Sequence, residues 1–434
     1  MTANALAYAS ERPPVGERRP HLLRRDGAIH FFLTLPLFGG VFLSRFVITF
    51  FNRELSVPLL VIITSMIGLA AFGRLRVHMP RLILFMLCMA AMLATTLLGG
   101  AGRVSAMSFL LLAVLYLSYV FVVDGDEGTY AWVILAFRRI CLITAVAGIA
   151  QFVAQLALPG PTLFTFRGFI PDSFLALQYN YVDPSDFLPG VNKSNGFFLP
   201  EPSIFGQLMG LAVISEILFF RPSYRLFILG LGLFVSFSGT GVILCGIFVP
   251  LLLLRRGNPI LLLLAASLAI VLLLLSGSWY LEPFLGRMGE FGSTHSSGFA
   301  RFLSPFYLFD DFLFTSVRNT LFGLGPGAIE TFFKNFYTEV HDPTWGKLFF
   351  EYGLVGTLPF ALFIACTFFA DAPVKWLAGA LFLNWLLMGG YLLSAPIAGL
   401  ALSLTVWHRA ARTPPAARTE DKRLSFTGYP AGAG

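Results

Sequence analysis

Charged side chains are scarce in this chain. Lysine, arginine, aspartate and glutamate make up 12% of the 434 residues, whereas hydrophobic residues make up 56%. Because a soluble globular protein carries about 25% charged residues, this composition excludes a soluble enzyme of two or three domains. The apolar residues come in runs of the roughly 20 residues that a spanning helix needs, and the alternating segments of a transmembrane β-barrel are absent. The sequence therefore predicts an all-α, polytopic integral membrane protein.

Cysteine and metal-binding motifs are also rare. The four cysteines lie within apolar runs, at Cys88, Cys141, Cys245 and Cys366. They have no metal-ligand spacing, and none lies in a long polar loop where an oxidising compartment could pair it. We interpret them as small packing residues. The loops also lack an Asp-x-Asp motif, so we expect neither a metal nor a cofactor.

About twelve apolar segments are long enough, or nearly so, to cross a membrane. They lie at roughly 31–50, 55–72, 82–98, 106–123, 131–158, 203–220, 226–238, 240–254, 259–276, 347–369, 374–389 and 391–407. The pair 226–254 is short, so we expect two short or re-entrant segments that turn at the Ser/Gly-rich stretch 236–241. Together these segments form a predicted membrane domain over residues 31–408.

The net charge of +7 could suggest nucleic acid in a soluble protein, but here most basic residues flank apolar runs and set the topology. The positive-inside rule places on the cytoplasmic side the disordered tail 1–30, the tail 409–434, and the basic residues between spans. Those residues are Arg74, Arg76, Arg81, Arg221, Arg225, Arg255, Arg256 and Lys375. Both termini are therefore expected to be cytoplasmic.

Two long loops, at about 159–202 and 277–346, then fall on the outer face. They hold 11 of the 18 acidic residues outside the tails, so we expect the chemistry there. In the second loop, apolar stripes over 299–313 and 329–340 predict amphipathic helices packed at the membrane surface. The glycine-rich stretch 323–327 predicts a sharp turn between them rather than a phosphate-binding loop.

His341 and Glu201 are candidate proton acceptors in these loops. His341 comes just before a long helix, whose positive end keeps the imidazole neutral and able to accept a proton from a hydroxyl. It could equally be an interfacial histidine that makes one backbone hydrogen bond. Asp342 with Pro343 predicts a helix cap. Glu201 before Pro202 similarly predicts a helix start, or a carboxylate that orients or deprotonates an acceptor.

Cations of the outer loops are candidate phosphate ligands. A guanidinium fork matches phosphate oxygens bidentately, which suits Arg301 and Arg318, with Lys193 beside them. Arg45 lies in the first apolar run, where an ionisable residue is a functional candidate. The alternative is that these side chains extend to lipid headgroups.

The order of these features resembles the bacterial family of Wzy-type polysaccharide polymerases and O-antigen ligases. The resemblance rests on the stretch from Arg301 to Gly356, with its glycine turn, amphipathic helix, His341-Asp342 and Glu351-Tyr352-Gly353. The segment 197–203 and the turn 236–241 add to it. Within the family, the chain is most similar to exopolysaccharide polymerases of the xanthan type.

This resemblance implies a helical membrane glycosyltransferase of the bacterial inner membrane. Its donor would be a saccharide on undecaprenyl diphosphate, polymerised without a metal at the periplasmic face, where the two long loops would lie. The implied partners are the lipid-linked oligosaccharide, membrane lipids, a chain-length co-polymerase and a flippase, but no nucleic acid. The alternatives are an O-antigen-type ligase and, with less support, a transporter or flippase of lipid-linked saccharides.

The resemblance also implies roles for the candidate residues. His341 or Glu201 would remove the acceptor proton. Arg301, Arg318, Lys193 and Arg45 would bind the diphosphate. Contacts to the glycan would come from Arg167, Trp345 and Tyr337.

Overall fold

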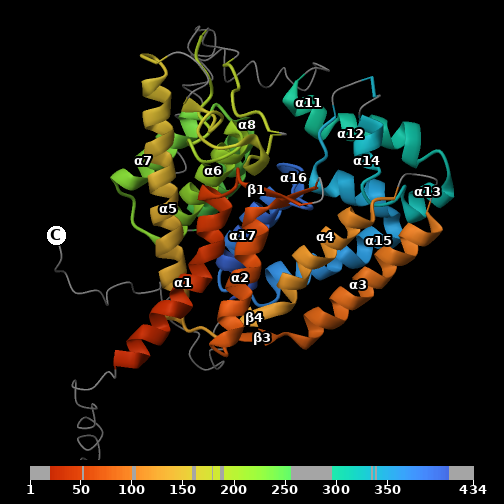
Figure 1. Ribbon diagram of the computed structural model, residues 1–434, viewed down its shortest axis with the longest axis horizontal. Helices are drawn as coiled ribbons and strands as arrows, with labels where there is room; N and C mark the ends of the chain where they lie inside the picture. The colour runs from red at the N-terminus through yellow and green to blue at the C-terminus, as the bar shows by residue number, and fades with distance from the viewer. Residues whose placement is uncertain are drawn as a thin grey trace, which may run out of the picture.

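A computed structural model gives the fold of the chain (Figure 1). It describes residues 20–50, 53–99, 104–158, 163–177, 179–185, 190–255, 296–333, 336–337 and 340–409. This part of the chain is mostly helical, as the apolar runs predict. Most of the two predicted tails, the predicted span 259–276 and the start of the second loop lie outside the described residues.

Four helices are long and apolar enough to cross a membrane by length and composition: α3 (Met79–Leu98), α5 (Glu127–Ala154), α6 (Pro202–Phe219) and α15 (Thr344–Phe369). The shorter apolar helices are α2 (Val57–Ala71), α4 (Ala106–Leu117), α7 (Tyr224–Val235), α8 (Gly239–Arg255), α16 (Lys375–Leu387) and α17 (Ala395–Ala401). Helix α1 (Pro20–Phe42) contributes a shorter apolar part, Gly27–Phe42. The π-helical segment η7 (Leu402–Val406) extends α17. Each predicted span within the described residues overlaps one of these helices, while the number of crossings stays a prediction.

The helix starts follow local capping signals. Asp126 caps α5, because its carboxylate accepts a hydrogen bond of 2.8 Å from the Thr129 N–H. The predicted start at Pro202 is confirmed for α6, with Glu201 in the N-cap position. Helix α1 begins at Pro20, inside the predicted N-terminal tail, and ends at Phe42, before the predicted limit at residue 50.

Four short strands depart from the predicted all-α chain. Strand β1 (Val47–Phe50) pairs with β2 (Arg53–Ser56), and β3 (Leu75–Val77) pairs with β4 (Phe121–Val123), both antiparallel. Strand β1 takes the end of the predicted span 31–50, where β-branched residues favour an extended backbone. Arg45 therefore lies after α1 and not within a spanning helix.

The helices pack around two cores. In the larger core, α6 packs on α8 and on α7, α15 on α3, and α1 on α2. The smaller core is aromatic and surrounds Phe309 and Phe350. Instead of the predicted continuous helix over 299–313, short segments build it, because the chain breaks at Leu303 before Pro305. The short segments of this region are α11 (Ser297–Phe302), α12 (Ser304–Leu308), η6 (Phe309–Leu313), α13 (Val317–Phe322) and α14 (Ile329–Phe333).

Polar contacts tie the helix ends together at the lower end of Figure 1, which we call the β3–β4 end. Asp371 lies 3.3 Å from His78 Nε2 and 3.4 Å from Arg81 Nη2. The Val123 N–H donates to the Trp407 carbonyl oxygen at 2.7 Å. Segments that the positive-inside rule assigns to one side of the membrane thus meet at one end of the bundle.

Candidate functional site

The glycine turn and helix α15 form the base of the candidate site. Helix α15 is kinked at Gly353, where φ is +58°. At the kink, the Phe350 and Glu351 carbonyl oxygens accept hydrogen bonds from the Leu324 and Gly325 N–H groups, at 3.0 and 2.9 Å. The turn at 323–327 between α13 and α14 is therefore confirmed, and it supplies the donors that the kinked helix lacks.

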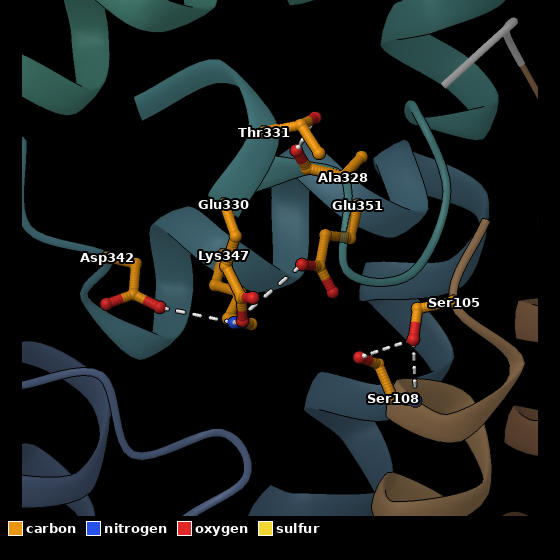
Figure 2. Close-up of polar contacts among 8 residues, drawn as sticks. All are labelled: Ser105, Ser108, Ala328, Glu330, Thr331, Asp342, Lys347 and Glu351. Atoms are coloured by element: carbon orange, nitrogen blue, oxygen red, sulfur yellow. Dashed lines mark hydrogen bonds and ion pairs between the residues drawn. The ribbon is translucent and has the colours of Figure 1, made fainter. Parts of the chain in front are cut away.

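Lys347 lies at the centre of a buried charge cluster on the first turn of α15 (Figure 2). Its side chain is 6% exposed, and its Nζ lies 3.2 Å from Glu330 Oε1, 3.3 Å from Asp342 Oδ2 and 3.9 Å from Glu351 Oε1. Glu351 also accepts a hydrogen bond from the Gly327 backbone. One ammonium therefore joins α14, the segment before α15, and α15 itself.

Asp342 does not cap α15, so the predicted cap is wrong. Pro343 occupies the N-cap position and the helix begins at Thr344. The Asp342 carboxylate turns to Lys347 instead, because a buried ammonium needs an opposite charge. On its other side it abuts the loop between α16 and α17: a Cβ atom on Gly390 would lie 2.6 Å from Asp342 Oδ1.

Arg301 is a buried cation that pairs with no anionic side chain among the described residues. Its residue is 8% exposed, and its Nε has no hydrogen-bond partner. Its side chain makes no hydrogen bond or ion pair with any residue that the structure describes. Tyr391, on the α16–α17 loop, interacts electrostatically with Arg301 and, less strongly, with Glu201. Two candidates from separate loops, Arg301 and Glu201, thus act electrostatically on the same tyrosine.

A hydrogen-bond chain holds Tyr391 in place. Its hydroxyl donates to Gln207 Oε1 at 2.5 Å. The Gln207 amide donates to Thr240 Oγ1 at 3.0 Å and to the Met388 carbonyl oxygen at 3.1 Å. Thr240 belongs to the predicted turn at 236–241 but lies in the first turn of α8, so the start of this helix contacts Gln207.

The histidine candidate, His341, lies on a segment that is hydrogen-bonded to the segment of Arg301. The His341 N–H donates to the Ala300 carbonyl oxygen at 2.9 Å, and the residue is partly buried. This bond is made by the main chain of His341 and not by its imidazole, and it brings the residue to the segment that carries Arg301. Both interpretations of His341 therefore stay open.

The predicted glycan contacts have partners other than Arg301 among the described residues. The Trp345 ring packs against Phe306 and Phe309 in the aromatic core, with ring centroids 5.2 and 5.7 Å apart. Tyr337 is 69% exposed. Arg167 is also exposed, 3.9 Å from Asp172 in its own loop.

Three of the predicted diphosphate ligands have protein partners. Arg45 donates to the carbonyl oxygens of Leu199 and Phe164. Lys193 pairs with Asp183 at 3.2 Å. The exposed Arg318 donates to the last carbonyl groups of α3. Of the four cations, Arg301 alone makes no such bond within the described residues.

Sequence reasoning missed Lys347, Gln207 and Tyr391. The predicted span 347–369 already contained a signal, because Lys347 and Glu351 are ionisable residues one turn apart in an apolar helix, and such residues are functional candidates by default. Gln207 and Tyr391 carry no comparable signal, since nothing in their local sequence shows that they meet.

Comparison with known proteins adds a family. A family model described as WcaD colanic acid polymerase matches residues 31–324. No curated protein and no solved structure matches the chain. The matched stretch contains Glu201 and Arg301 and ends before the Lys347 cluster.

Proposed function

The chain belongs to the WcaD colanic acid polymerase family of Wzy-type polymerases, and from this premise we propose the details of its reaction. It joins oligosaccharide repeat units carried on undecaprenyl diphosphate into an exopolysaccharide. The reaction takes place at the periplasmic face of the inner membrane, with both termini in the cytoplasm. A xanthan-type product is part of this proposal and rests on the sequence resemblance.

The observation that carries the proposal is the buried residue Arg301, whose Nε has no hydrogen-bond partner and whose side chain makes no ion pair with the described residues. A guanidinium removed from water is strongly unfavourable unless an anion or several hydrogen-bond acceptors accompany it. The diphosphate of a lipid-linked donor is such an anion, and a guanidinium matches its oxygens geometrically. The Glu201 carboxylate, which comes from the other loop, can bind the hydroxyl groups of a sugar.

In the proposed transfer, a hydroxyl oxygen of the acceptor unit attacks the anomeric carbon of the donor chain. The bond from that carbon to the phosphate oxygen breaks as the new glycosidic bond forms. Glu201 or His341 takes the acceptor proton, and Arg301 stabilises the negative charge that builds on the departing diphosphate. Because lipid diphosphate is already a good leaving group, the proposed reaction needs no metal.

The test is to extract lipid-linked sugars from cells that lack this protein. A polymerase predicts single repeat units that accumulate on the periplasmic leaflet and disappear when the gene is restored. Long lipid-linked chains would indicate a ligase, and single units confined to the cytoplasmic leaflet would indicate a flippase. Either of these two results would contradict the proposal.

A further inference from the structure

The Lys347 cluster contains more carboxylates than ammonium groups. Glu330, Asp342 and Glu351 all lie within 3.9 Å of the one ammonium. An ordinary structural ion pair needs only one carboxylate, so the arrangement calls for a reason why three elements converge on one cation. The three carboxylates differ in their other contacts, and this difference indicates a role for Lys347.

Among the described contacts of the three carboxylates, only those of Asp342 lead to the segments that carry Arg301, His341 and Tyr391. Asp342 follows His341, whose N–H is bonded to the carbonyl group just before Arg301. Its Oδ1 abuts Gly390, next to Tyr391. Glu330 by contrast has a side chain that is 66% exposed on α14, and Glu351 faces the glycine turn through Gly327.

The start of α15 is joined to the same loop by backbone contacts. The Thr344 N–H donates to the Gly389 carbonyl oxygen at 3.0 Å, and the Tyr391 N–H donates to Thr344 Oγ1 at 3.1 Å. Lys347 lies one turn further along the helix, and its own N–H donates to the Pro343 carbonyl oxygen at 2.9 Å. Backbone hydrogen bonds therefore already hold the start of α15 against the α16–α17 loop. The Lys347 ammonium adds to them by setting the position of the Asp342 side chain.

We propose that Lys347 is a positioning residue for the transfer reaction, and that it acts through Asp342. By holding the Asp342 carboxylate against Gly390, Lys347 fixes the α16–α17 loop, with Tyr391, relative to the segment of Arg301 and His341. This inference rests on the proposed function. Lys347 touches neither the donor nor the acceptor, so its effect falls on turnover and not on substrate affinity.

Asp342 and Glu330 provide a matched pair for the test, because their carboxylates lie at nearly the same distance from Lys347 Nζ. The substrate is the pool of lipid-linked repeat units extracted from cells lacking this protein, supplied to the purified full chain in lipid nanodiscs. Asp342→Asn should lower kcat roughly tenfold or more, with KM within about twofold, because small displacements of reacting groups cost large factors in rate. Glu330→Gln should stay within about twofold of the unmodified protein, since exposed ion pairs contribute little.

A second pair of variants tests whether Lys347 acts through Asp342. Lys347→Met alone would leave Glu351 buried without its cation and could prevent folding, so Lys347→Met is combined with Glu351→Gln. This double variant should lose kcat as Asp342→Asn does, and adding Asp342→Asn should cause no further loss, since residues in one network are not additive.

Three results would overturn the inference. Asp342→Asn could keep the full kcat, Glu330→Gln could lose as much as Asp342→Asn, or the loss could fall on KM alone. In any of these cases Lys347 would be a structural anchor only. Failure of the proposed function is distinguishable, because the unmodified protein would then not lengthen the lipid-linked units at all.

Discussion

Two buried arginines, Arg45 after α1 and Arg301 in α11, have opposite surroundings. Arg45 is 1% exposed, and its guanidinium donates to the Leu199 carbonyl oxygen at 2.9 and 2.7 Å and to that of Phe164 at 2.7 Å. The rings of Phe166 and Tyr181 flank it, with centroids 5.0 and 4.8 Å away. Arg301 is nearly as buried but makes no hydrogen bond or ion pair with the described residues.

This difference separates a structural cation from an available one. Carbonyl groups and aromatic faces compensate the burial of Arg45 without a carboxylate. Burial lowers the pKa of Arg45 to about 10, which is still well above neutral pH, so the side chain stays charged and keeps the loop 163–201 attached to the end of α1. Arg301 has no such compensation from the described residues, and in the proposed function the diphosphate of the donor supplies it.

Replacing Arg301 should give the largest loss of activity. Removing one group that stabilises developing negative charge costs about 100-fold to 1,000-fold in kcat, so we expect Arg301→Gln to lower turnover of lipid-linked units by this factor. The thermal midpoint should stay the same or rise, because an uncompensated buried charge is removed. Rate assays and thermal unfolding on the same purified sample measure both. Undiminished turnover would remove Arg301 from the site and leave its burial unexplained.

Replacing Arg45 should instead give the largest loss of stability. Arg45→Gln leaves the Leu199 and Phe164 carbonyl groups short of donors, and each unsatisfied buried group costs about 1–3 kcal/mol. We expect a lower thermal midpoint and a smaller folded yield. Turnover per folded molecule should stay within a few-fold of the unmodified protein. A variant with normal stability and lost turnover would show that Arg45 also binds substrate, and the contrast with Arg301 would fail.

The sequence predicts what local composition determines. Apolar runs predicted the helices, Glu201-Pro202 predicted the start of α6, and the glycines at 323–327 predicted a turn, because each depends on neighbouring residues alone. The partners of buried cations depend on contacts between distant segments, such as the one that joins Arg45 to Leu199. The sequence therefore grouped Arg45 with Arg301 although their surroundings differ.

The predicted cap at Asp342 failed for a related reason. Its position before Pro343 is a local signal for a helix N-terminus, but Lys347 competes for the same carboxylate. Pro343 takes the N-cap position, so α15 begins at Thr344. The ion pair between the Asp342 carboxylate and the buried Lys347 ammonium is more favourable than a hydrogen bond that this carboxylate would accept from an N–H group of the helix. The sequence did not reveal that Lys347 and the helix N-terminus compete for the Asp342 carboxylate, because Lys347 falls in the predicted span 347–369 and not in the loop before it.

Arg318 should have the smallest effect of the three arginines. It is exposed, and it donates from Nε to the Leu98 carbonyl oxygen at 2.9 Å and from Nη2 to that of Gly99 at 3.0 Å. A cation at the C-terminal end of a helix contributes about 0.3–1 kcal/mol, so Arg318→Gln should lower the thermal midpoint slightly. Its turnover should stay within about twofold, since substituting exposed residues rarely has larger effects. If Arg318→Gln instead weakens donor binding strongly, an arginine that already has protein partners also binds the diphosphate. The lack of protein partners would then no longer distinguish Arg301 as the substrate-binding cation.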